Sequence, residues 1–147
     1  MRVERCTHET LDDLATLRWE LWPEAPIATH HTEAAEDLSA PDRAIAFIVR
    51  DEDGVAVGFA EASLRRDYVN GCETSPVAFL EGIYVRAEQR KRGVARLLIQ
   101  AVEGWGKEKG CSEFASDADI GNDVSRRMHA ALGFEETERV VFFRKSL

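Results

Sequence analysis

Apolar residues recur along the chain with two periods, and at its centre they predict a strand followed by a long helix. The run Ala78 to Val85 is almost continuously apolar, as is typical of a buried strand. From Val94 to Lys109 the apolar residues fall three and four positions apart, which predicts a helix with one buried face. Glu81 and Gly82 interrupt the strand, and a carboxylate beside a glycine there indicates a bulge or a close approach of two backbones.

Shorter segments on both sides continue the alternation of strands and helices. The expected elements are a strand at Met1–Cys6, a helix that Thr10 caps and Pro23 ends, a short helix capped by Thr32 within Ile27–Leu38, strands at Ala44–Arg50, Val55–Leu64 and Glu113–Ser116, a helix at Asp123–Ala131 capped by Asn122, and a strand pair at Phe134–Glu138 and Val140–Arg144. The order β-α-α-β-β-β-α-β-α-β-β describes an α/β sandwich around a mixed, mostly antiparallel sheet. The two strands joined by the long helix form a parallel pair. We expect this pair to splay at its C-terminal ends and to admit an extended ligand.

Composition and charge narrow the classes of function. A chain of 147 residues suits one domain, and we expect a single domain over residues 1–147. The 27 acidic and 19 basic residues give a net charge of −8, which disfavours nucleic acid and anionic membranes but suits a polycationic substrate. We find no apolar run as long as a membrane span and no signal peptide. Cys6, Cys72 and Cys111 are not spaced like metal ligands, and we interpret them as reduced thiols of a cytoplasmic protein.

The turn between the central strand and the long helix is the one clearly basic cluster. Arg90, Lys91 and Arg92 are followed by Gly93, which permits a tight turn into the helix. The first amides of a helix have no internal partners, so three cations beside them form a site for a phosphate or pyrophosphate. An ordinary basic loop between a strand and a helix is the alternative, because a short glycine pattern is a weak signal by itself.

Two motifs carry a resemblance to a known superfamily. QRKRGVA, at residues 89–95, matches the Q/R-x-x-G-x-G/A signature of the GNAT-type N-acetyltransferases, and NDVSRRMHAALGF resembles their next motif. The strings RRDYVNGCETSPVAFLEGIYV, EFASDAD, LGFEETERVVFFRK and LRWELWP are similar to one subgroup, the aminoglycoside 6′-N-acetyltransferases. The resemblance covers nearly the whole chain.

The resemblance implies acetyl-CoA as cosubstrate, no metal, and a GNAT-like fold whose splayed strand pair forms the acetyl-CoA cleft. The turn would hold the phosphates, and the strand edge would form the pantetheine slot. A side-chain bond from Asn122 is implied by the family pattern, although helix capping explains that residue equally well. The expected cofactor-binding residues are Ile83, Tyr84, Val85, Arg90, Lys91, Arg92, Gly93, Val94, Ala95, Arg96 and Asn122.

Acetylation requires that a protonated amine lose its proton, and two carboxylates are the catalytic candidates. A βαβ unit can bring Glu81 and Asp117 to one cleft, where either could accept the proton directly or through water. Glu81 could instead be a bulge residue paired with an arginine, and Asp117 could cap the next turn. The substrate-binding residues that the resemblance implies are Trp22, Tyr68, Glu81, Asp117 and Glu138, of which Glu138 could reach the site of a partner subunit.

Two positions depart from the family pattern. Many superfamily members place a tyrosine three residues before the leucine of LGF, as a general acid for the thiolate, and this chain has His129 there. His129 could donate a proton or only pack, or the thiolate could leave without an acid, so we leave it unassigned. Some relatives of the subgroup have a histidine shortly after the Trp-Pro pair, where this chain has Ala25.

Three functions remain open at the level of sequence. The first is an enzyme that moves an acetyl group from acetyl-CoA to the 6′-amine of an aminoglycoside and so confers resistance, acting as a homodimer. The second is the same transfer to another amine, such as a polyamine or a protein amine. The third is a sensor that binds acyl-CoA without catalysis, which the carboxylates Glu81 and Asp117 argue against.

Overall fold

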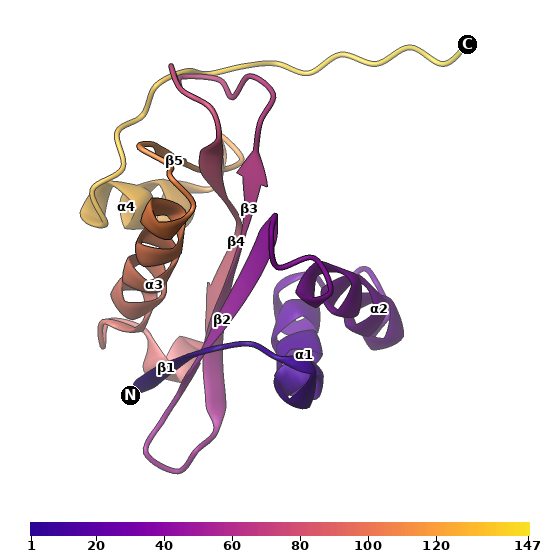
Figure 1. Ribbon diagram of the computed structural model, residues 1–147, viewed down its shortest axis with the longest axis vertical. Helices are drawn as coiled ribbons and strands as arrows, with labels where there is room; N and C mark the ends of the chain where they lie inside the picture. Colours follow the sequence, from indigo (N-terminus) through magenta and orange to yellow (C-terminus); the bar gives the residue numbers. More distant parts are fainter.

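A five-stranded sheet lies between two pairs of helices in the computed structural model, which describes residues 1–147 (Figure 1). The strands follow one another in space as in sequence: β1 (Arg2–Arg5), β2 (Ala44–Arg50), β3 (Ala56–Arg65), β4 (Val77–Val85) and β5 (Phe114–Ala115). Helices α1 (Leu11–Leu21) and α2 (Ile27–Leu38) cover one face, and α3 (Val94–Glu108) and α4 (Asp123–Ala131) lie on the other. Short 3₁₀ turns stand at His8–Thr10 and Ala87–Gln89. The expected α/β sandwich is confirmed.

Alternation along β3 builds a separate core on each face of the sheet. Ala60 and Ala62 belong to a cluster with the buried face of α3, whose apolar spacing the sequence predicts. Phe59 belongs to a second cluster, with Leu14 and Leu17 of α1. A strand alternates its side chains between the two faces, so successive β3 residues serve opposite layers.

The register of β4 with its two neighbours creates an opening at the centre of the molecule. Glu61 pairs with Gly82 and Ala62 pairs with Leu80, so Glu81 is an extra residue, and the expected bulge is confirmed. On its other side β4 pairs in parallel with β5 at two positions, Ala78 with Phe114 and Phe79 with Ala115. Beyond Phe79 the edge of β4 that faces β5 has no strand partner.

Two helix starts differ from the sequence-based expectation. The Thr10 hydroxyl bonds back to the turn before α1, accepting from the Thr7 amide (2.9 Å), and makes no side-chain cap on α1 itself. Helix α2 begins at Ile27 directly after Pro26, whose extended backbone sets the entry of the chain. Thr32 therefore lies inside that helix, where its hydroxyl donates to the Ala28 carbonyl (3.1 Å).

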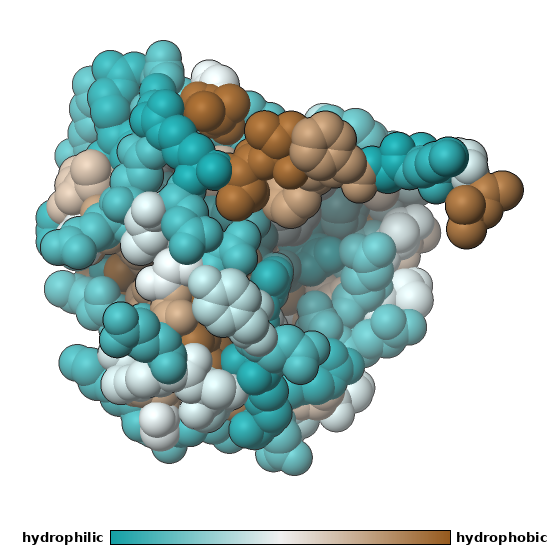
Figure 2. Space-filling model, turned by 90° about the horizontal axis from the view of Figure 1, so that it is seen from above, coloured by the Kyte–Doolittle hydropathy of each residue, from teal (hydrophilic) through white to brown (hydrophobic).

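The strand pair expected at Phe134–Glu138 and Val140–Arg144 is wrong for this chain. Residues 134–147, which we call the C-terminal arm, form no strand. Phe134 packs against Phe114 of β5, and the arm then projects away from the sheet (Figure 1). The side chains from Val140 to Phe143 are exposed, and Phe143 is 92% exposed; Figure 2 shows apolar side chains along the projecting arm. β5 is only two residues long, so it offers the arm little edge to pair with inside one chain. The β-forming pattern of the arm lacks a partner here.

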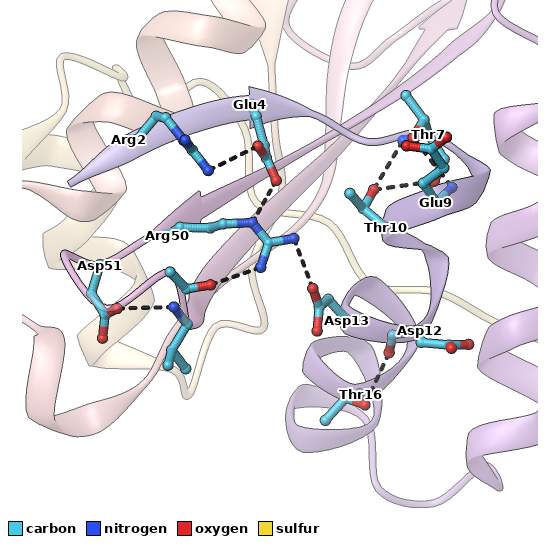
Figure 3. A network of polar contacts seen from close by, with 12 residues as sticks. Arg2, Glu4, Thr7, Glu9, Thr10, Asp12, Asp13, Thr16, Arg50 and Asp51 are labelled. Atoms are coloured by element: carbon cyan, nitrogen blue, oxygen red, sulfur yellow. Dashed lines mark hydrogen bonds and ion pairs between the residues drawn. The ribbon is translucent and has the colours of Figure 1, made fainter.

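An arginine fastens α1 and β1 to the sheet (Figure 3). Arg50, at the end of β2, donates to Glu4 on β1 (2.6 Å), to Asp13 on α1 (2.8 Å) and to the Gly54 carbonyl (3.0 Å). Gly54 has φ +80° in the turn between β2 and β3, as the Asp-Gly pattern predicts. These bonds fix the layer of helices that carries Trp22.

Candidate active site

The basic turn before α3 has the backbone geometry of an anion site. Lys91 and Gly93 both adopt left-handed conformations, with φ +62° and +81°. A side chain at positive φ is uncommon and costs about 1–2 kcal/mol, so the surrounding turn over-determines the conformation of Lys91. The first amide bonded inside α3 is that of Leu97, to the Gly93 carbonyl (3.1 Å), which leaves the amides of residues 94–96 open at the helix end.

The side chains of this turn divide into two kinds. Arg90 donates from Nε to the Val85 carbonyl (2.9 Å), and Arg96 donates from Nη2 to the Ala131 carbonyl (3.4 Å). These two cations therefore also brace the turn against β4 and α4. Lys91 and Arg92 are exposed at the helix end, and Arg92 donates only to the Gln89 side chain (3.4 Å). Open backbone amides and exposed cations together suit a phosphate.

The predicted pantetheine slot lies on the β4 edge that faces β5. Ile83 packs on the α3 side of the sheet, whereas the ring of Tyr84 lies 6.5 Å from that of Phe59 on the α1 side. Tyr84 and Val85, like Ile83, follow the last position at which β4 pairs with β5. Their backbone groups on that edge are free of a strand partner, which is what an extended amide-containing ligand requires.

Asn122 caps α4, which is the alternative to cofactor binding that the sequence offered. Its side-chain oxygen accepts from the Ser125 amide (3.0 Å). The capping bond uses the oxygen and leaves the amide nitrogen available, so capping does not conflict with a bond to a cofactor.

Trp22 lies directly over the bulge of β4. A Cβ built on Gly82 would stand 2.5 Å from Cη2 and 2.8 Å from Cζ2 of the indole, so only glycine leaves room for this contact. The indole is held by the edge of Phe59, at a ring distance of 6.0 Å, and by the stacked ring of His30 at 6.3 Å. His30 donates from Nε2 to the Trp22 carbonyl (2.8 Å). Trp22 therefore forms a fixed wall beside Glu81.

A buried ion pair supports that wall from below. Arg18 of α1 donates from Nη1 to both oxygens of Glu61 on β3 (2.5 and 2.6 Å) and from Nη2 to Glu33 on α2 (2.7 Å). The Arg18 guanidinium also lies 5.4 Å from the centre of the Trp22 ring. Burial raises the pKa of the Glu61 carboxyl, and the charge of Arg18 opposes that rise.

Glu81 does not stand free in its bulge. It accepts from Nε and Nη2 of Arg65 (3.0–3.2 Å) and from the Ser63 hydroxyl (2.5 Å). The Arg65 guanidinium in turn lies 3.5 Å from the centre of the Phe79 ring. The alternative considered from the sequence, a bulge carboxylate paired with an arginine, describes this geometry. Glu81 also lines a cavity of about 320 Å³ that reaches under α2.

The other residues predicted to bind the acceptor, Asp117, Tyr68 and Glu138, do not line this cavity. Asp117 is exposed. It lies two residues beyond the last position at which β5 pairs with β4, and Glu81 lies two residues beyond the matching position of β4. Tyr68 is 75% exposed in the loop after β3. Glu138 lies on the arm, whose Thr137 lies against Gly71 of the same loop. Both carboxylates thus lie just beyond the point at which β4 and β5 cease to pair.

His129 has partners for both of its ring nitrogens. Nδ1 donates to the Ser125 carbonyl (2.7 Å), so Nε2 accepts from the Ser116 hydroxyl (2.7 Å). Its ring lies 5.1 Å from that of Phe134. His129 therefore links α4 to the residue that precedes Asp117.

The sequence interpretation missed the polar groups beneath the site. Glu61, Ser63 and Arg65 follow each other at the two-residue period of one face of β3, and this pattern was the available signal. Arg18 stands four residues after Leu14, on the apolar face of α1. A charge at a buried helical position and another inside a buried strand point to an ion pair between them.

No group of three or more His, Cys, Asp or Glu side chains is arranged to hold a metal ion. None of the helices combines the length and the apolar character needed to cross a membrane.

The splayed strand pair, the bulge and the glycine turn at a helix start are those of an acetyltransferase, and the chain belongs to the Acetyltransferase (GNAT) family, matching it over residues 11–134. Its relatives include the aminoglycoside N(6′)-acetyltransferase type 1 of Serratia marcescens, 55% identical over 97% of each chain. The protein of the same name from Salmonella typhimurium is 52% identical over 99% of each chain.

Solved structures resemble the whole chain. One is AAC(6′)-Iy in complex with the bisubstrate analogue CoA-S-monomethyl-acetylneamine, with a TM-score of 0.94, 49% identity and coverage of 99% of this chain and 98% of that one. Another is AAC(6′)-Iy in complex with CoA, with a TM-score of 0.95, 49% identity and coverage of 99% and 95%.

Proposed function

We propose that this protein transfers an acetyl group from acetyl-CoA to the 6′-amino group of aminoglycosides and thereby confers resistance to them. The observation that carries the proposal is the likeness, over nearly all of both chains, to an enzyme solved with a CoA–acetylneamine bisubstrate analogue. Two carboxylates just beyond the paired part of β4 and β5, those of Glu81 and Asp117, suit a cationic acceptor. The chain would act as one domain over residues 1–147.

In the proposed cofactor site, the open amides of α3 and the cations of the basic turn hold the phosphates of acetyl-CoA. The unpaired edge of β4, at Ile83–Val85, binds the pantetheine amides. A backbone amide freed by the bulge then stabilises the negative charge that develops on the thioester oxygen. Asn122 would add a bond from its free amide nitrogen.

In the proposed acceptor site, Trp22 packs against the sugar, Tyr68 closes over it from the loop, and Glu81 accepts a hydrogen bond from the amine. The ammonium loses one proton to Asp117, directly or through water, and the neutral nitrogen then attacks the thioester carbon. The bond from carbon to sulfur breaks, and the CoA thiolate leaves. The nitrogen of the adduct gives up a second proton, which the departing CoA sulfur takes. Asp117 is exposed and has no side-chain partner, which suits proton transfer directly or through water better than the paired Glu81 does.

Direct attack in a ternary complex is favoured because the thiols are poor nucleophiles. Burial raises the pKa of the Cys6 thiol to about 12 and raises those of Cys72 and Cys111 above the usual value. A cysteine that carries the acetyl group covalently needs the opposite shift. The three free thiols also suit a reducing compartment, and we propose that the reaction takes place in the cytoplasm.

Release of free thiol from acetyl-CoA, followed with a panel of acceptors, tests the proposed function. We expect turnover with tobramycin and kanamycin, and none with analogues that carry a 6′-hydroxyl in place of the amine. Spermidine and a lysine peptide are the comparison amines. Turnover only on these would overturn the acceptor assignment, and tight CoA binding without turnover on any amine would indicate a sensor.

We further propose that two copies of the chain exchange their C-terminal arms. Four consecutive apolar side chains on the arm, from Val140 to Phe143, are 51–92% exposed, and a monomer gains nothing from exposing them. An edge next to β5 of a second copy would pair the arm and cover these side chains. Glu138 would then reach the acceptor site of the partner.

Replacing both phenylalanines of the arm, Phe142→Ser with Phe143→Ser, is expected to give a monomer. Light scattering during gel filtration should find a dimer for the unaltered protein and half that mass for the variant. The KM for tobramycin should rise at least tenfold if the partner supplies Glu138, as for loss of a charge-assisted bond. A variant that stays dimeric would exclude the arm as the contact.

A further inference from the structure

Arg65 is the cation nearest to the proposed acceptor carboxylate, and its contacts show that it is fixed there. Two of its nitrogens donate to Glu81, with bonds of 3.0 and 3.0 Å from Nη2 to the two carboxylate oxygens and of 3.2 Å from Nε to Oε1. The Phe79 ring supports the guanidinium from one side at 3.5 Å. The ring contact and the two-nitrogen grip together hold the guanidinium beside Glu81.

The bonds to Glu81 leave its two oxygens unequal. Oε1 accepts from Arg65 twice and from the Ser63 hydroxyl once, whereas Oε2 accepts only from Nη2 of Arg65. A carboxylate oxygen has two lone pairs, so Oε2 retains room for one more donor. Glu81 is 37% exposed and lines the cavity, so that donor can be an amine of the substrate.

A carboxylate and an ion pair treat a bound amine differently. A free carboxylate stabilises the ammonium form, because an opposite charge at contact distance raises the pKa of the cation. Acetylation needs the neutral amine, so that stabilisation works against the chemical step. A carboxylate already paired with a guanidinium still accepts a hydrogen bond but attracts a proton on the amine much less.

We propose that Arg65 is a positioning and charge-balancing residue which lets Glu81 bind the acceptor amine without holding its proton. The inference rests on the proposed function, because it needs Glu81 to face the amine. Arg65 acts through Glu81 and does not itself touch the reacting atoms. Glu81 then binds the amine, and the proton of the amine leaves through Asp117, directly or through water.

The other charged groups around Glu81 do not replace Arg65. Asp37 of α2, Glu61 of β3 and Arg43, which precedes β2, line the same cavity. Glu61 is paired with Arg18, and Arg18 also binds Glu33 of α2. None of these groups is hydrogen-bonded to Glu81.

Arg65→Gln has a distinctive expected signature. The variant should bind the ammonium form about tenfold more tightly and the neutral amine unchanged, since an exposed charge near a titrating group shifts its pKa by about one unit. At neutral pH, kcat and KM for tobramycin should therefore both fall by about tenfold, and kcat/KM should stay the same. The acid limb of the kcat profile should move about one unit to higher pH.

The measurement is the initial rate of thiol release at saturating acetyl-CoA with tobramycin varied, over the neutral and mildly alkaline range. Arg65→Lys retains a cation and should restore the position of the acid limb. Arg2→Gln removes a positive charge at the far edge of the sheet, where Arg2 is exposed beside Glu4, and should leave the profile unmoved.

Each outcome decides one question. A lower kcat/KM with an unmoved acid limb would overturn the inference, because it would mean that Arg65 only holds Glu81 in place. The inference would also be overturned if Arg65→Lys left the acid limb of the kcat profile at the same shifted pH as Arg65→Gln. Failure of the unaltered protein to acetylate tobramycin would overturn the proposed function, and the inference with it.

Discussion

Arg18→Met is expected to lower the free energy of unfolding by about 3–5 kcal/mol, because it leaves the Glu61 carboxylate buried without its partner. The side chain of Arg18 is 7% exposed and that of Glu61 is 10% exposed, so water cannot replace the lost bonds. Urea unfolding at neutral pH measures the loss. The double variant Arg18→Met with Glu61→Leu should recover most of it, since two apolar groups replace the pair.

Acidic conditions should reduce the loss in Arg18→Met. Burial already raises the pKa of Glu61, and removing Arg18 takes away the charge that opposes the rise. A carboxyl whose pKa is higher in the folded state than in the unfolded state costs stability above the folded pKa. The cost disappears as the pH falls through that value towards the ordinary one, because the protonated carboxyl is neutral.

Arg86→Met is the matched control for the buried pair. Arg86 donates to Glu20 with the same kind of geometry (2.7 Å), but the two side chains are 25% and 24% exposed. Partly solvated pairs contribute about 1 kcal/mol or less. A loss in Arg18→Met no larger than that of this control would mean that water reaches the pair between α1 and the sheet.

Gly82→Ala should weaken acceptor binding far more than it weakens the fold. The added methyl group would stand 2.5 Å from the indole of Trp22, so the ring must tilt away from the bulge. Crowding of this kind costs about 1–3 kcal/mol of stability. A displaced platform should raise the KM for tobramycin at least tenfold, equivalent to about 1.4 kcal/mol of binding, with the KM for acetyl-CoA unchanged.

Steady-state kinetics with each substrate varied in turn tests Gly82→Ala. Gly104→Ala is its control, because a Cβ on Gly104 would meet nothing within 4 Å. Gly104 lies in α3, where alanine is favoured over glycine by up to about 1 kcal/mol, so this variant should be as stable as the unaltered protein or more so. An unchanged KM for tobramycin in Gly82→Ala would remove Trp22 from the acceptor site.

Local patterns predicted most of the architecture, because the features involved are decided within a few residues. The helical period fixed α3, and the carboxylate beside a glycine marked the bulge at Glu81. The C-terminal arm shows where such prediction stops. Its apolar residues have strand propensity, but a strand also needs a paired edge, and the two residues of β5 offer little of one.

The charged network of the site was hidden from the sequence for a different reason. The contacts of Arg65 and Glu81 join residues 16 positions apart, and those of Arg18 and Glu61 join residues 43 apart. Partners at such separation are chosen by the register of the sheet and by where α1 lies on it. Pattern alone showed that Glu81 was unusual but could not select its arginine.

The two-residue pairing of β5 has a consequence for hydrogen exchange. No residue after Gly106 is buried, so β5, α4 and the arm share little of the core. Segments of this kind open locally at a lower free energy than the rest of a domain. The amides of residues 112–147 should therefore exchange early in a lone chain. Ligand bound at the cleft, and a second copy of the chain, would slow them, so the stability of this part becomes a function of concentration.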